Sequence, residues 1–152
     1  MKTFLTINIL LVLLSACSYD NAFSRFDISP QRESSEENIV SSKIYDQKSI
    51  AGVVSCVYLN AVNPKKYNDG EYFYIYLYAK NSKAAVSFTL NDMNASIITE
   101  LEADNEFTVL TDSNVSWQKY YFLKFASEDA NLILITKVGN FSSDTIVFVK
   151  DD

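Results

Sequence analysis

The side chains available for chemistry in this chain are limited, because its 152 residues include no histidine. Ser-His-Asp and Cys-His catalysis, histidine metal sites and histidine pH switches are therefore excluded. The sequence also lacks a G-x-S-x-G nucleophile motif, a phosphate-binding loop and a Gly-rich dinucleotide fingerprint. A pair of carboxylates could hydrolyse sugars, but among 19 acidic residues some such pair is inevitable. We therefore expect a protein that is not an enzyme and that holds no metal and no cofactor.

A row of aromatic residues is the feature best suited to binding. Four tyrosines alternate with apolar residues between Glu71 and Lys80, and in a strand they would share one face at intervals of about 7 Å. Tyrosine has a rigid apolar ring and a polar tip, so an exposed row could stack against sugars or anchor a protein partner. The candidate binding face consists of Tyr72, Tyr74, Tyr76 and Tyr78, extended from a neighbouring strand by Tyr120 and Phe122.

The same row also has a purely structural interpretation, to which we give more weight. Large exposed aromatic patches are uncommon on monomeric proteins. A short helix within residues 30–45, or another strand, could cover the tyrosines and make them part of a core. The sequence leaves both interpretations open.

Two asparagines lie in a pattern that could carry a glycan. Asp92-Met93-Asn94-Ala95-Ser96 and Asp112-Ser113-Asn114-Val115-Ser116 each place an acidic residue two positions before the asparagine of an N-x-S sequence. This spacing resembles the extended acceptor sequon of certain bacterial N-glycosylation systems, which implies Asn94 and Asn114 as glycosylation sites near turns. Asn, Asp and Ser are abundant in the chain, so we give more weight to a chance match.

The first seventeen residues have the organisation of a secretory leader. Lys2 precedes an apolar segment, residues 4–14, which as a helix would be roughly 16 Å long and too short to span a bilayer in the usual way. Leu14-Ser15-Ala16-Cys17 then resembles the lipobox of bacterial lipoproteins, an aliphatic residue and two small residues before a cysteine. The resemblance implies that residues 1–16 are removed and that acyl chains on Cys17 anchor the protein to a membrane. Ser18 resembles the default for outer-membrane sorting, so we expect a lipid-anchored protein of the bacterial cell envelope, in the outer membrane.

The charge balance disfavours polyanionic partners. The net charge is −6, and removal of Lys2 with the leader leaves 12 basic against 19 acidic residues, or −7. Nucleic acid and anionic lipid head groups are therefore poor candidate partners. Cys56 is then the remaining thiol, within the apolar run 53–57. We expect it to be buried as a small apolar side chain, with an intermolecular disulfide as the alternative.

The rest of the chain divides into a tether and a folded domain. Residues 17–48 begin with the lipidated Cys17 and are rich in serine and charge, which is typical of a tether that lifts a domain off the membrane. Ser29-Pro30 can begin a short helix within residues 30–45. The thin apolar stripe of that helix would consist of Ile39, Val40, Lys43 and Ile44.

Residues 49–152 are predicted to form an all-β domain, because their apolar pattern has a period of two. About eight strands separated by turns, with no long helical crossover, predict a single antiparallel β-sandwich, immunoglobulin-like or related. A Cys…Trp…Cys framework is absent, and the short connection at residues 81–83 has the length of a hairpin. The predicted strands are residues 49–59, 71–80, 86–90, 95–101, 107–110, 120–126, 132–138 and 145–149.

Two functions fit this organisation. The first is a lipid-anchored, non-catalytic module that binds or assembles with another protein of the cell envelope. The second is a lipoprotein that binds carbohydrate or peptidoglycan through the same tyrosine face. The expected partners are therefore a membrane, reached through the N-terminal lipid, and an envelope protein or a glycan.

Overall fold

The alternating run that begins at Glu71 forms the centre of the fold. In the computed structural model, which describes residues 30–47, 49–111 and 113–150, this run is β3 (Glu71–Ala79). It pairs with β2 (Ser49–Tyr58) on one side and with β7 (Lys119–Phe125) on the other. β1 (Ile39–Asp46) and β6 (Ile97–Leu101) complete a first sheet in the order β1-β2-β3-β7-β6.

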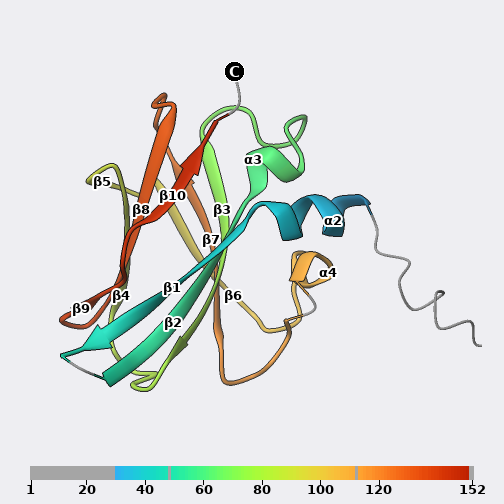
Figure 1. The fold of residues 1–152 in the computed structure, drawn as a ribbon. Helices are drawn as coiled ribbons and strands as arrows, with labels where there is room; N and C mark the ends of the chain where they lie inside the picture. Colours follow the sequence, from blue (N-terminus) through green and yellow to red (C-terminus); the bar gives the residue numbers. More distant parts are fainter. Residues whose placement is uncertain (1–29, 48, 112, 151–152) are drawn as a thin grey trace, which may run out of the picture.

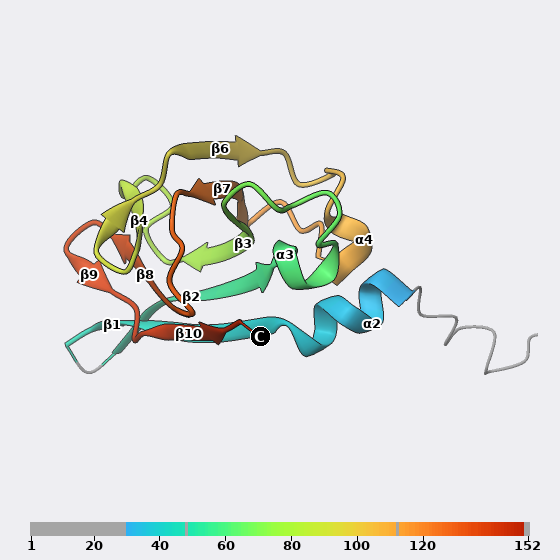
Figure 2. The same ribbon diagram turned by 90° about the horizontal axis from the view of Figure 1, so that it is seen from above.

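A second five-stranded sheet faces the first (Figures 1 and 2). It runs in the order β10-β8-β4-β5, with β9 paired to β8, and every pairing in both sheets is antiparallel. The fold is therefore an all-β sandwich, as predicted. Its remaining strands are β4 (Val86–Leu90), β5 (Met93–Asn94), β8 (Asn131–Val138), β9 (Phe141–Ser142) and β10 (Ile146–Val149).

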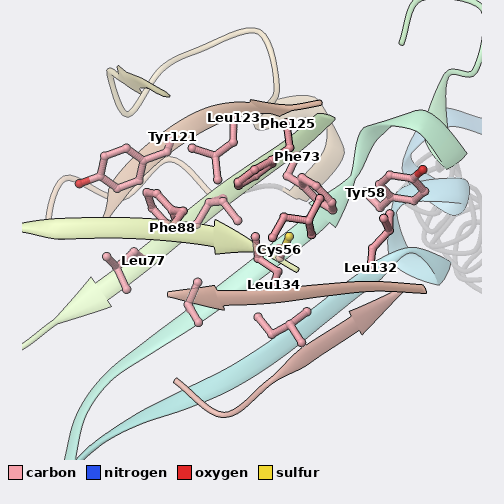
Figure 3. Packing of buried hydrophobic residues seen from close by; sticks show 14 of the residues in the cluster. Cys56, Tyr58, Phe73, Leu77, Phe88, Tyr121, Leu123, Phe125, Leu132 and Leu134 are labelled. Atoms are coloured by element: carbon pink, nitrogen blue, oxygen red, sulfur yellow. The ribbon is translucent and has the colours of Figure 1, made fainter. Parts of the chain in front are cut away.

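The main core lies between the two sheets (Figure 3). Phe73, Ile75 and Leu77 of β3 point into it and are at most 1% exposed, which confirms the predicted alternation. Each such side chain contributes about 1.5–3 kcal/mol by leaving water. Other residues of this core are Val54, Cys56, Phe88, Leu90, Leu123, Phe125, Leu132, Leu134 and Ile146.

The sheet begins earlier in the chain than predicted. β1 pairs with β2 from Ile39↔Val57 onward, so residues 39–46 belong to the sandwich rather than to a tether. The helix α2 (Pro30–Glu37) does begin at the proline, but it ends before the apolar stripe. The prediction that residues 39–44 form the apolar stripe of a helix is therefore wrong. In a strand Val40 and Ile44 point to the same side, where Val40 packs against the main core and Ile44 is fully buried in it.

Two further local predictions are wrong. Residues 107–110 are not a strand, because α4 (Thr108–Thr111) occupies this segment, and Phe107 and Leu110 are buried three residues apart on one side of it. The connection between β3 and β4 is not a hairpin either, because β3 lies in the first sheet and β4 pairs with β5 and β8 in the second.

Three short helices gather at one end of the first sheet. They are α2, α3 (Leu59–Val62) and α4, and both views place them together, with the β1–β2 hairpin at the opposite end (Figures 1 and 2). In the part of the chain that the structure describes, none of these helices has the length and apolar character needed to cross a membrane.

Candidate functional site

The outer face of the first sheet is the face that points away from the second sheet. Strand pairing arranges its side chains in rows that cross the strands. Tyr74 lies opposite Val57 and Phe122, and Tyr76 lies opposite Ser55 and Tyr120. Residues directly opposite each other in an antiparallel pair point to the same side of the sheet. The structure therefore places the six aromatic residues chosen from the sequence on one face: Tyr72, Tyr74, Tyr76, Tyr78, Tyr120 and Phe122.

Most of this row lies in a second core rather than on the surface. Tyr74 is 0% and Tyr120 is 1% exposed, and Tyr72, Tyr76 and Phe122 are half-buried. The Tyr74 ring stacks on the Phe107 ring with 4.9 Å between centroids. Burial raises the pKa of Tyr74 and of Tyr76. The second core consists of Val57, Leu59, Tyr67, Tyr74, Phe107, Leu110 and Tyr120.

The cover of the second core comes from two segments that follow other strands. Leu59 and Tyr67 belong to the α3 segment after β2, and Phe107 and Leu110 belong to the α4 segment after β6. α2 packs on both of these helices. It is fixed by the buried Ser35 hydroxyl, which donates a hydrogen bond of 2.6 Å to the Leu110 carbonyl oxygen.

One end of the tyrosine row remains in contact with solvent. Tyr78 is 37% exposed, and Trp117, from the loop between α4 and β7, is 61% exposed. Their ring centroids lie 5.5 Å apart at an interplanar angle of 85°, so the indole and the phenol ring meet edge to face. Aromatic pairs favour this arrangement, which contributes about 0.5–1.5 kcal/mol beyond the area buried.

Exposed apolar residues of β1 and β2 extend the surface around this aromatic pair. Val53 lies opposite both Lys43 and Tyr78, so these three residues form one row. Beyond an irregularity after Ile44, Tyr45 pairs with Ile50, and these residues are 41% and 39% exposed. We call this surface the open face. It consists of Lys43, Tyr45, Ile50, Val53, Tyr78 and Trp117.

Most of the open face could not be recognised from the sequence. Tyr78 was among the candidate residues, but Trp117 and Tyr45 were not. Trp117 is the single tryptophan of the chain and lies between two predicted strands, which is the one local signal that could have drawn attention to it. Tyr45 was assigned to the tether, so its place on a sheet could not be recognised.

A polar cleft of about 730 Å³ lies at the helical end of the sandwich, around the first residue of β3. Glu71 is one of the residues that line the cleft and is 4% exposed. It accepts a hydrogen bond of 2.5 Å from the Tyr58 hydroxyl and forms an ion pair of 2.5 Å with Lys150. Burial, followed by the neighbouring Glu71 carboxylate, raises the pKa of Tyr58.

The polar groups at this cleft mostly bond to one another. Asn60 donates to the Gly70 carbonyl oxygen and accepts from the Tyr72 amide. Asp69 forms an ion pair of 2.8 Å with Lys124 and accepts a hydrogen bond from the Tyr72 hydroxyl. The bond from Lys124 and then that from Tyr72 lower the pKa of Asp69. These contacts join β3, β7 and the residue that follows β10, so the cleft is primarily a structural junction.

The remaining predicted residues are separate from both of these regions. Cys56 is a free thiol, 0% exposed in the main core, which confirms the expected burial. That burial also raises the pKa of the Cys56 thiol. Asn94 in β5 and Asn114 in the loop before β7 are both exposed. Cys17, with the lipobox-like residues 14–17 and the leader 1–16, lies outside the described residues.

Comparison with known proteins assigns this chain neither to a family nor to a function. No protein-family model, no curated protein and no solved structure matches this chain. Within residues 30–47, 49–111 and 113–150, no group of three or more Cys, Asp and Glu side chains is arranged to hold a metal ion.

Proposed function

We propose that this protein is a non-catalytic binding module, held at a bacterial membrane by a lipid on Cys17, and that the open face is its contact surface. The observation that carries the proposal is the exposed indole of Trp117, fixed edge to face against Tyr78. Tryptophan and tyrosine are the residues most enriched among those that dominate the energy of protein interfaces.

The composition of the open face supports a protein partner. Tyr45 and Ile50 are more than a third exposed, and they lie on the same side of the sheet as Tyr78. An aromatic and aliphatic surface of this kind has apolar area to bury against apolar side chains. Lys43 at its margin can pair with a carboxylate of the partner, because no salt bridge involves it within the described residues.

The geometry of the rings argues against a flat stacking platform. The planes of Tyr78 and Trp117 are 85° apart, so a sugar ring can stack on one of them but not on both. Neighbouring Ile50 and Val53 offer no hydrogen-bonding side chain to sugar hydroxyl groups. A protein side chain inserted beside the two perpendicular rings would use both of them.

The position of the open face suits a protein tethered through its N-terminus. α2 follows residues 18–29 and lies at the opposite end of the first sheet from the β1–β2 hairpin (Figure 1). Twelve residues after Cys17 can reach at most about 40 Å when fully extended. An anchor on Cys17 would thus hold the helical end within about 40 Å of the membrane and leave the open face accessible at the other end.

Substitutions on the open face test its role. Trp117→Ala and Tyr78→Ala should each weaken capture of an envelope protein by about 2 kcal/mol, close to thirty-fold, while leaving the protein folded. The full lipidated chain would be the bait, and Ile133→Ala, at a side chain of the second sheet that is exposed to about the same extent as Tyr78, is the control. Equal capture by Trp117→Ala and Ile133→Ala would show that the open face is not the site.

The membrane anchor needs a test of its own. Cys17→Ser should release the protein from membranes and prevent maturation, since the thiol that would carry the lipid is gone. Normal maturation of this variant, with continued partition into membranes, would remove the anchor from the proposal.

Glycan binding is a second candidate, favoured by the exposure of Trp117 alone. One indole face is sufficient to stack on one sugar ring. Cosedimentation with purified peptidoglycan separates the two candidates. Retention that depends on Trp117 but is unaffected by Ile50→Ala and Tyr45→Ala would favour the glycan over a protein.

A further inference from the structure

The edge strand β6 exposes a row of unpaired backbone groups. It is the last strand of the first sheet, where it pairs with β7 alone, and Figure 2 shows it at the margin of the molecule. Ile97, Ile98, Thr99 and Glu100 are all exposed, the two isoleucines by 44% and 50%. In an antiparallel pair, alternate residues of an edge strand direct their N–H and C=O groups away from the sheet.

The other sheet edges of the described residues are shorter or partly covered. β5 has two residues and β10 has four. β1 is bridged at Ile44 to Ser143, and the Lys43 carbonyl oxygen accepts a hydrogen bond from the Asp144 amide. Proteins usually protect edges with charge, proline, bulges or covering segments. β6, with the sequence Ile-Ile-Thr-Glu-Leu, has one charge and no proline.

We propose that β6 pairs with β6 of a second copy of this chain, antiparallel about a two-fold axis at Thr99. In this register Thr99 faces Thr99 of the second copy, Ile97 faces Leu101, and Ile98 faces Glu100. Each pair joins residues on the same side of the sheet, because Ile97, Thr99 and Leu101 lie opposite Lys124, Phe122 and Tyr120 on the outer face. Threonine pairs and aliphatic pairs across strands are both favourable.

The charges of β6 permit this pairing. Each strand carries a single carboxylate, Glu100, which faces Ile98 across the axis and not its own symmetry mate. The Lys119 ammonium of the same chain lies 3.8 Å from the Glu100 carboxylate and partly offsets its negative charge. No like charges are therefore opposed along the strand, although the whole chain has a net charge of −6 that keeps copies apart elsewhere.

The small size of the contact limits how stable the dimer can be. Five residues on each side bury less than the roughly 800 Å² per partner of a typical stable interface. We therefore expect a weak, reversible dimer, and a covalent trap is the appropriate measurement.

The experiment uses the full chain in its membrane with a single new cysteine. Opposed residues of an antiparallel pair have Cβ atoms about 4.5–5.5 Å apart, close to the span of a disulfide. Thr99→Cys should give a homodimer on mild oxidation or with a short thiol cross-linker, at a yield at least several-fold above Ile133→Cys, an exposed control on the second sheet. The buried Cys56 is common to both variants.

A charge exchange tests the register. Thr99→Lys alone or Thr99→Glu alone should lose self-association, and a mixture of the two should regain it as a mixed dimer. Cross-linking of Thr99→Cys no greater than that of Ile133→Cys would overturn the proposal. So would a cross-linked product containing a different protein, which would identify β6 as an edge for a foreign strand. A mixture that stays monomeric would exclude the two-fold axis at Thr99.

Discussion

The two ends of the tyrosine row differ in burial although they share a strand, a face and a residue type. Tyr74 is fully buried, whereas Tyr78, four residues later on β3, is 37% exposed. The difference comes from what covers each end. The α3 and α4 segments lie over Tyr74, whereas Tyr78 is in contact with the exposed ring of Trp117. Position on the sheet therefore decides whether a tyrosine is buried in the second core or left accessible to solvent.

Truncation of the two tyrosines should give the largest contrast. Tyr74→Ala removes a ring that stacks on Phe107 and Tyr120, so it should lower the free energy of unfolding by about 3–5 kcal/mol. Tyr78→Ala removes a partly solvated ring and should cost about 1 kcal/mol or less. Denaturant titration of both variants measures the difference. Equal losses would mean that the open face is as much a part of the core as the covered end.

Loss of the contact between α2 and α4 should have an intermediate effect on stability. The effect should be confined to the covered end of the tyrosine row, around Tyr74. Ser35→Ala leaves the buried Leu110 carbonyl oxygen without the Ser35 hydroxyl, at a cost of about 1–3 kcal/mol. Hydrogen exchange should increase in residues 105–111 and remain unchanged in the β1–β2 hairpin. Ser49→Ala, at an exposed hydroxyl in that hairpin, is the control. Uniform acceleration across the sheet would contradict two separately stabilised ends.

The sandwich could be predicted because its signal is local. Period-two alternation placed Phe73, Ile75 and Leu77 in the main core, and the apolar run around Cys56 indicated its burial. The stripe at Ile39, Val40 and Ile44 misled because apolar residues at i, i+1 and i+5 fit one face of a short helix and also fit a partly buried strand. Phe107 directly precedes α4 and Leu110 lies within it, and a helix of four residues is too short to show a period.

The division of the tyrosine row could not be predicted, because it depends on contacts distant in sequence. Nothing in the residues next to Tyr74 or Tyr78 distinguishes the two. Their environments are set by Phe107 and Trp117, which are 33 and 39 residues further along the chain. The Trp117 loop and the α4 segment both precede β7, so one connection covers one end of the row and leaves the other accessible.

Alkaline pH should distinguish the covered end of the row from the open face through the titration of the Tyr74 hydroxyl. Burial raises the pKa of Tyr74 above its ordinary value of 10, so the unfolded chain loses this proton first. The corresponding stability is complete below pH 10 and is lost as the pH rises toward the folded pKa. Above pH 10 the free energy of unfolding of Tyr74→Phe should therefore fall less than that of the wild type. Chemical unfolding at each pH measures this free energy, and tyrosinate absorbance reports the loss of the proton. Tyr78→Phe serves as the matched comparison, and indistinguishable alkaline profiles for the wild type and Tyr74→Phe would count against the burial of Tyr74.

Acid pH should produce the smallest effect on stability. The group concerned is the exposed Asp69 carboxylate at the margin of the covered end, which is bound by Lys124 and Tyr72. These bonds lower the pKa of Asp69, so its contribution is complete above the unfolded value of about 4 and is lost as the pH falls through the folded pKa. Asp69→Asn should be slightly less stable than the wild type at neutral pH, and the two should converge in acid. High salt should narrow the same difference, because exposed ion pairs are screened. The exposed Asp144→Asn is the control. A difference that persists unchanged through acid and salt would show that Asp69 acts through hydrogen-bond geometry in the turn and not through its charge.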